Sequence, residues 1–219
     1  MSQSPSRSFL HGLQDMGTKM LFGTDTGTGK DTFYETEAVN IQGEKVSMKT
    51  FENNVLIVVN VASFWGLTNR NYTDLVRLHN RFGENLKILA FPCNQFGKQE
   101  PKSHEEILEF AKKFDNADEK FIFFAKSHVN GKETNEVFSY LKNAIPWQDG
   151  SKDVRWNFGK FLIDHEGTPW KRFGSKEAPS TMIEDVKMLI TRKTGLPFPA
   201  EEVEVEGREG LGLEGKAEK

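Results

Sequence analysis

A tryptophan stands where this chain is best arranged for chemistry. The segment NVASFWGLT, residues 60–68, joins the end of an apolar run to a polar segment with helical spacing. In α/β proteins the carboxyl end of a strand is a favoured place for an active site, and the N-terminus of the following helix favours an anion. Trp65 occupies this corner, yet an indole provides one N–H donor and no nucleophile. The corner is therefore suited to a reaction that its own side chain does not support.

A second polar segment, AFPCNQFGKQEP at residues 90–101, also follows an apolar run that predicts a buried strand. The amide of Gln95 is a candidate donor of hydrogen bonds to whatever occupies the neighbouring corner. Cys93 is the only cysteine of the chain, and we interpret it as a small buried hydrophobic residue. An ordinary loop is the alternative interpretation of the whole segment.

The third segment, VRWNFGKFLID at residues 154–164, places Trp156 and Asn157 just before another predicted strand. The indole supplies one N–H donor and the amide supplies two. An aromatic anchor packed under the sheet is the alternative, and Phe158 and Phe161 suit that role. Each segment alone leaves both interpretations open.

Composition and spacing exclude several other classes of protein. The net charge of −3 gives no general attraction to nucleic acid or anionic membranes, and no apolar run reaches the length of a transmembrane helix. The five histidines lack metal-ligand spacing, and a single cysteine excludes an intramolecular disulfide. The segment GTDTGTGKDT departs from a phosphate-binding loop at Thr24 and Asp31, so we interpret it as a flexible linker.

The apolar pattern predicts the elements that position the three segments. A β-hairpin is expected around residues 42–43, followed by strands at 55–61, 87–92, 121–125, 160–164 and 170–173, and by helices at 71–81, behind the 103–106 capping box, at 135–142 and at 179–194. Strands that alternate with helices imply a mostly parallel sheet. The small fold that fits best is a thioredoxin-like α/β fold, with a central mixed sheet, helices on both faces and an N-terminal β-hairpin.

Three parts are expected along the chain: a flexible N-terminal arm at residues 1–32, a folded domain at 33–196 and a charged disordered tail at 197–219. The first residues contain an arginine, four serines and no acid, which faintly resembles an organelle transit peptide. A disordered arm is the simpler interpretation. We therefore expect a cytoplasmic protein, with the mitochondrion or plastid as alternatives.

Together the three segments resemble the glutathione peroxidase family. The signatures NVASFWGLT, FPCNQFGKQEP and WNFGKFLID stand in the family's order and spacing, and the resemblance extends from residue 33 to residue 190. The signature regions are most similar to the phospholipid-hydroperoxide type. The segment between Ile145 and Trp156 is short, whereas tetrameric members carry a long insertion there, and this implies a monomer.

The resemblance implies a thiol-dependent peroxidase that reduces hydrogen peroxide and organic or lipid hydroperoxides, with a role in the response to oxidative stress. It implies no metal or prosthetic cofactor. In the family a selenolate or thiolate at the corner attacks a peroxide oxygen. Carried over to this chain, position 65 is the nucleophile, and Gln95, Trp156 and Asn157 surround it.

The resemblance also implies a reductant, which is glutathione or a thioredoxin-type protein. Arg155 is the candidate for attracting the carboxylates of glutathione, and a solvated surface charge is the alternative. Lys98, Lys152 and Lys160 are weaker candidates of the same kind.

The chain departs from the family at the nucleophile, because Trp65 stands where members have selenocysteine or cysteine. One interpretation is that Trp65 stands for selenocysteine, whose UGA codon is one base from the tryptophan codon UGG. The other is a genuine tryptophan in an inactive protein with a binding or regulatory role. The region after QEP contains no resolving cysteine, which favours the selenocysteine type. A bulky ring beside Gly66 should not fit a tight corner, so we expect Trp65 to be partly exposed.

Overall fold

The computed structural model describes residue 25 and residues 27–198, so the expectations for the other terminal residues lie outside it. Its centre is a five-stranded sheet in the order β5-β4-β3-β6-β7. The strands are β3 (Val55–Val61), β4 (Leu86–Pro92), β5 (Ile122–Phe123), β6 (Lys160–Ile163) and β7 (Pro169–Phe173). The first three run parallel, β6 pairs antiparallel with β3, and β7 at the edge pairs antiparallel with β6. The mixed sheet expected from the sequence is confirmed.

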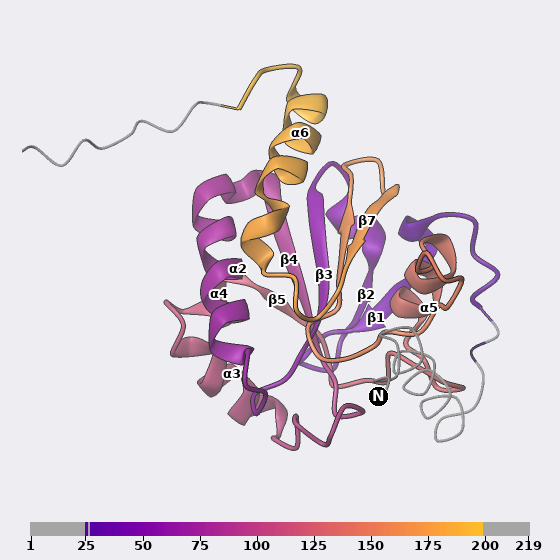
Figure 1. Ribbon diagram of the computed structural model, residues 1–219, viewed down its shortest axis with the longest axis vertical. Coiled ribbons are helices and arrows are strands. Elements are labelled where there is room, and N and C mark those ends of the chain that lie inside the picture. The colour runs from indigo at the N-terminus through magenta and orange to yellow at the C-terminus, as the bar shows by residue number, and fades with distance from the viewer. Residues whose placement is uncertain (1–24, 26, 199–219) are drawn as a thin grey trace, which may run out of the picture.

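Helices cover both faces of this sheet (Figure 1). They are α2 (Thr68–Phe82), α3 (His104–Lys112), α4 (Ala117–Lys120), α5 (Glu136–Ala144) and α6 (Ile183–Thr194), with 3-10 turns η1 (Phe33–Glu35), η2 (Met48–Phe51), η3 (Gly83–Asn85) and η4 (Pro179–Met182). Figure 1 shows α2, α3, α4 and α6 on one side and α5 on the other. Among the described residues, no helix is both long and apolar enough to cross a membrane.

The continuous apolar run of β3 reflects burial on both faces of the sheet. Val55, Ile57 and Val59 belong to a core cluster with α2 and α6, whereas Leu56 and Val58 pack with α5 and the N-terminal turns. Alternate side chains of a strand point to opposite faces, so a central strand between two helical layers needs apolar residues throughout. The two layers fix β3 in place and thereby fix the corner at its carboxyl end.

The structure differs from the sequence-based elements mainly at boundaries. The N-terminal hairpin forms as β1 (Glu37–Val39) and β2 (Lys45–Ser47), and the Ser103 capping box is present at α3. The helix that begins at Thr68 starts three residues earlier than the apolar spacing indicates. The final helix is divided into η4 and α6, and the short α4 has no counterpart among the predictions.

The chain is already packed against the domain before residue 33. Ser139 of α5 donates a hydrogen bond from Oγ to Asp25 Oδ1 (2.7 Å), and Lys142 Nζ lies 3.2 Å from Asp25 Oδ2. Lys142 is fully buried and also contacts Asp153 at 3.2 Å. Asp25, which the sequence placed in a flexible linker, is therefore tied to α5 by a hydrogen bond and a largely buried ion pair.

Candidate active site

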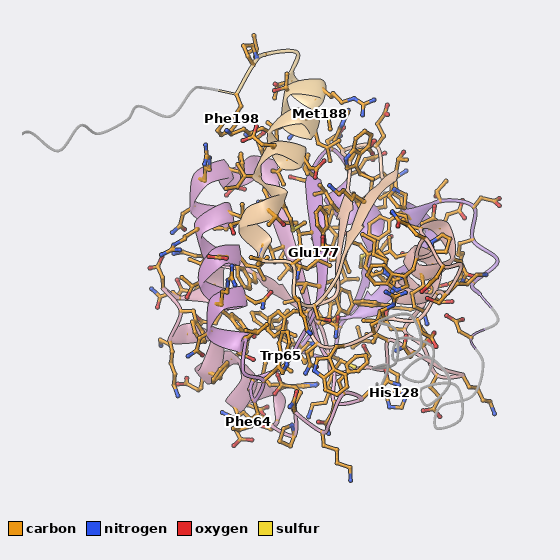
Figure 2. All side chains as sticks on the ribbon, viewed as in Figure 1. Phe64, Trp65, His128, Glu177, Met188 and Phe198 are labelled. Atoms are coloured by element: carbon orange, nitrogen blue, oxygen red, sulfur yellow. The ribbon has the colours of Figure 1, made fainter. Side chains whose placement is uncertain are left out.

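The candidate site lies at the carboxyl end of β3, where Figure 2 shows Phe64 and Trp65. The Trp65 backbone N–H donates to Thr68 Oγ1 (3.2 Å), and the Thr68 hydroxyl donates to Ala62 O (2.7 Å). Leu67, at the N-cap position of α2, makes no side-chain cap. The first turn of α2 therefore keeps N–H groups that favour an anion at this corner.

Trp65 is partly exposed, which confirms the expectation from the tight corner. Its indole stacks on the ring of Phe158, with centroids 5.8 Å apart and planes inclined by 20°. The neighbouring Phe64 is 57% exposed. The indole thus covers the edge of the core instead of lying within it, so a smaller residue at position 65 would uncover the face of Phe158.

The side-chain amide of Asn157 forms a pair with the side-chain amide of Gln99 at the corner. Its Nδ2 donates to Gln99 Oε1 at 2.6 Å, and the Phe64 backbone N–H donates to the Gln99 carbonyl oxygen at 3.0 Å. Asn157 is fully buried, and its Oδ1 has no hydrogen-bond partner among the described residues. Buried polar atoms are nearly always paired, so an unmet acceptor beside a partly exposed corner indicates a place for a small polar ligand.

The loop that carries Trp156 and Asn157 is fastened to β3 by Asn60. The Asn60 side chain donates to Trp156 O (3.2 Å) and accepts from the Gly159 N–H (2.9 Å). Phe158 between them has a left-handed backbone with φ of 57°, an unusual conformation for a bulky residue and one that clusters at functional sites. Asn60 is not among the site residues expected from the sequence, although it is the one polar residue inside the apolar run of β3.

Gln95 does not lie with this group, which corrects the sequence-based placement. Its Oε1 accepts from the backbone N–H groups of Val129 (2.8 Å) and Asn130 (3.0 Å), and its Nε2 donates to Asn130 O (2.9 Å). These three bonds occupy the Gln95 amide in holding another loop. The amide that reaches the corner is that of Gln99, four residues later.

The reversal between the two glutamines explains the difference. Gly97 and Lys98 both have left-handed backbones, with φ of 61° and 52°. The chain therefore turns back after Phe96, and Gln99 returns to the end of β3. Phe96 in turn packs against the partly exposed ring of Trp156, with centroids 5.6 Å apart. The glycine after NQF was the signal in the sequence, because glycine favours such a turn.

Two further groups of the second segment are buried at the corner. Both carboxyl oxygens of Glu100 lie near Ser63 Oγ, at 2.9 and 3.1 Å, and burial raises the pKa of Glu100 to about 7. Cys93 is fully buried, and burial raises the pKa of its thiol to about 12. A thiol with that pKa is protonated at neutral pH, so Cys93 does not supply a thiolate nucleophile. Its interpretation as a buried hydrophobic residue agrees with the structure.

The basic candidates lie in different environments. Arg155 forms an ion pair with Asp149 and stacks over Trp147, with Cζ 4.5 Å from the ring centroid. Lys98 and Lys152 are exposed. Lys160 is fully buried, so its placement among surface charges was wrong: Nζ donates to the carbonyl oxygens of Phe158 (2.7 Å) and Gly174 (3.1 Å), and burial lowers its pKa to about 7.

Comparison with known proteins identifies the family. Residues 33–142 match the glutathione peroxidase family model. The phospholipid hydroperoxide glutathione peroxidase of Callithrix jacchus is 44% identical over 158 residues, which cover 71% of this chain and 78% of that protein. This chain belongs to the glutathione peroxidase family. A glutathione peroxidase of Schistosoma mansoni is 37% identical over 166 residues, covering 74% of this chain and 95% of that protein.

The fold agrees with this membership. The crystal structure of T. cruzi GPX1 superposes with a TM-score of 0.59 at 28% identity, covering 73% of this chain and 97% of that chain. A thioredoxin family protein from Chlorobium tepidum, at 14% identity and a TM-score of 0.50, shares the fold alone. The thioredoxin-like fold expected for the glutathione peroxidase family is therefore confirmed. Among the described residues, no group of His, Cys, Asp and Glu is arranged to hold a metal ion.

Proposed function

We propose that the corner at position 65 reduces hydroperoxides at the expense of a thiol, with selenocysteine or cysteine at position 65 in the competent protein. Membership of the glutathione peroxidase family supports the reaction class. The observation that carries the proposal is the Gln99–Asn157 amide pair held against an uncapped helix start. Gln99 bonds both to Asn157 and to Phe64, the neighbour of Trp65, and Trp65 uses none of the chemistry of these amides.

The reaction follows from the groups present. A selenolate or thiolate at position 65, stabilised by the first turn of α2, attacks the terminal peroxide oxygen; the O–O bond breaks and the selenenic or sulfenic acid forms. The departing alkoxide takes a proton and leaves as an alcohol. Asn157, Trp156 and Gln99 supply N–H donors for the developing negative charge. Two thiols then return the centre to its reduced form, releasing water and a disulfide.

Trp65 itself does not perform this step, because an indole forms no anion comparable to a thiolate. The buried Cys93 is the only cysteine of the chain, so it provides neither a nucleophile nor an accessible resolving thiol. A centre without a resolving thiol must be reduced directly by an external thiol. The lack of a resolving thiol favours selenocysteine over cysteine at position 65, and we propose glutathione as the reductant, with a thioredoxin-type protein as the second candidate.

The remaining assignments extend the same proposal. Relatives named for phospholipid hydroperoxide favour lipid hydroperoxides beside hydrogen peroxide as substrates. A monomer is proposed, and the cytoplasm is the proposed compartment; an Arabidopsis thaliana relative carrying the description mitochondrial makes that organelle the alternative. We also propose Arg155 as a contact for the carboxylates of glutathione. To bind there, a glutathione carboxylate must displace Asp149 from the guanidinium of Arg155.

The test replaces Trp65 with a small nucleophile. Trp65→Cys should couple peroxide consumption to glutathione oxidation, whereas Trp65→Ser, matched in size but without a thiol, should not. Circular dichroism checks that both variants remain folded. A folded Trp65→Cys protein with a titratable thiol and no turnover above the serine variant would overturn the proposal and favour an inactive binding protein. The messenger codon at position 65 then distinguishes selenocysteine, encoded by UGA, from tryptophan, encoded by UGG.

A further inference from the structure

Glu100 is an isolated buried acid at the corner. Its side chain is fully buried, the neutral hydroxyl of Ser63 lies near both carboxyl oxygens, and the backbone N–H of Ser63 is a second donor to this carboxyl. The described structure gives it no ion pair within salt-bridge distance. A buried carboxylate without a cation is costly, so this carboxyl favours its protonated form.

Glu100 is also part of the framework that places Gln99. Its backbone N–H donates to Asn94 Oδ1 at 2.9 Å, while the preceding carbonyl oxygen, on Gln99, accepts from Phe64 N–H at 3.0 Å. The Ser63–Glu100 bond and the Phe64–Gln99 bond are therefore neighbouring hydrogen bonds between the segment after β3 and the segment after β4. Position 65 directly follows the two residues, Ser63 and Phe64, that make these bonds.

From this arrangement we infer that Glu100 is a positioning residue whose buried carboxyl is coupled to position 65, so that a charge on Glu100 disfavours the anion at position 65. The inference rests on the proposed function, in which position 65 carries a selenolate or thiolate. A negative charge on Glu100 would oppose the negative charge on that nucleophile, because two like charges in a buried site disfavour each other. The two groups should therefore not be ionised together.

The charged and titratable neighbours of Glu100 come from four parts of the chain. Burial is the main cause of the raised pKa of Glu100; the positive charges of Lys126 and Lys102 act in the opposite direction. On α2, Tyr72 is fully buried, and its hydroxyl has no partner among the described residues. Burial is the main cause of the raised pKa of Tyr72 and of Cys93, and the carboxylate of Glu100 raises both further, so both lie within its electrostatic reach.

The test measures ionisation and not turnover. In the Trp65→Cys protein, the pKa of the new thiol is followed by thiolate absorbance as the pH rises. Adding E100Q keeps an acceptor for Ser63 and removes the charge, so the thiol pKa should fall by about one unit. Adding E109Q removes an equal charge from an exposed position on α3 and should leave the thiol pKa unchanged.

The outcomes separate this inference from the proposed function. A thiol pKa that is the same with and without the E100Q substitution, in folded proteins, overturns the inference even when peroxidase activity is present. A lowered thiol pKa supports it even when Trp65→Cys is inactive. E100A provides a second arm: it removes both the charge and the bond to Ser63, and a thiol pKa lowered as in E100Q assigns the effect to charge.

Discussion

The two halves of the loop after β4 contain similar residues and perform different tasks. In the first half, Gln95 makes three bonds to residues 129–130 and holds a neighbouring loop. In the second half, Gln99 bonds Asn157 and Phe64 at the corner. Gln95 and Gln99 have the same side chain and lie four residues apart, but the turn between them places one in a structural role and the other at the candidate site. Position in a motif does not by itself identify a catalytic amide.

The largest expected effect is on catalysis and concerns the second half. In the Trp65→Cys protein, Gln99→Ala removes the partner of Asn157 and an amide donor from the corner. Removing one positioned donor typically lowers turnover by roughly 10²–10³-fold, so we expect about a 10²-fold loss of kcat. Steady-state peroxide reduction with saturating thiol measures it. Equal activity of the Gln99→Ala and Gln95→Ala proteins would erase the distinction between the two halves.

The next effect is a pH dependence of the unfolding free energy, which we expect from Glu100 in the second half of the loop. Burial raises the pKa of Glu100 from 4.5 to about 7 in the folded chain. Between these values the folded state binds the proton and the unfolded state has lost it, so stability falls as the pH rises from 4.5 to about 7 and stays lower above that. At about 1.4 kcal/mol per unit, the loss is on the order of 3 kcal/mol.

Urea unfolding at a series of pH values measures this loss. The E100Q protein should lack the Glu100 contribution, so the difference in unfolding free energy between it and the parent should change across the interval. E109Q, altered at an exposed carboxyl, is the matched control. Parallel profiles for the parent and E100Q would show that Glu100 titrates normally.

Stability is where the first half should matter. Gln95→Ala leaves the N–H groups of Val129 and Asn130 without their acceptor. Each unmet buried donor costs about 1–3 kcal/mol, and for the two donors together we expect a loss of roughly 2–6 kcal/mol in unfolding free energy. Because Gln95 does not touch the corner group, kcat per folded molecule in the Trp65→Cys background should change little. A large fall in kcat with unchanged stability would return Gln95 to the site.

The fold was predictable because its signals are local and repeated. The apolar run of β3, in which Asn60 is the one polar residue, indicates burial on both faces, and the alternation of strands and helices indicates a mostly parallel sheet. Boundaries were less certain where tertiary contacts decide them. The start of α2 at Thr68 depends on the bond from its hydroxyl to Ala62 O, which no periodicity reveals.

The candidate site was predictable only in part. The corner and the segment with Trp156 and Asn157 follow from strand ends and a family resemblance. Gln99, and not Gln95, reaches the corner because two successive residues, Gly97 and Lys98, have left-handed backbones. Of these two, only the glycine is a recognisable turn signal in the sequence. The roles of Asn60 and Glu100 depend on contacts between segments about 100 and 37 residues apart. Such contacts leave no spacing pattern along the chain.

The smallest expected effect tests the reversal itself. Gly97 has φ of 61°, and a Cβ there would lie 3.5 Å from the Gln99 side chain, whereas Gly150 has φ of 78° with nothing within 4 Å. Replacing either glycine by alanine strains a left-handed residue, so both should lose roughly 1 kcal/mol of unfolding free energy. Of the two glycines, only Gly97 lies in the turn that leads to Gln99. Gly97→Ala should therefore also lower kcat in the Trp65→Cys protein, by a few fold, whereas Gly150→Ala should not. If both alanine variants lose the same stability and retain the same kcat, the turn is a passive connection, and the contacts of Gln99 and Glu100 suffice to hold the second half at the corner.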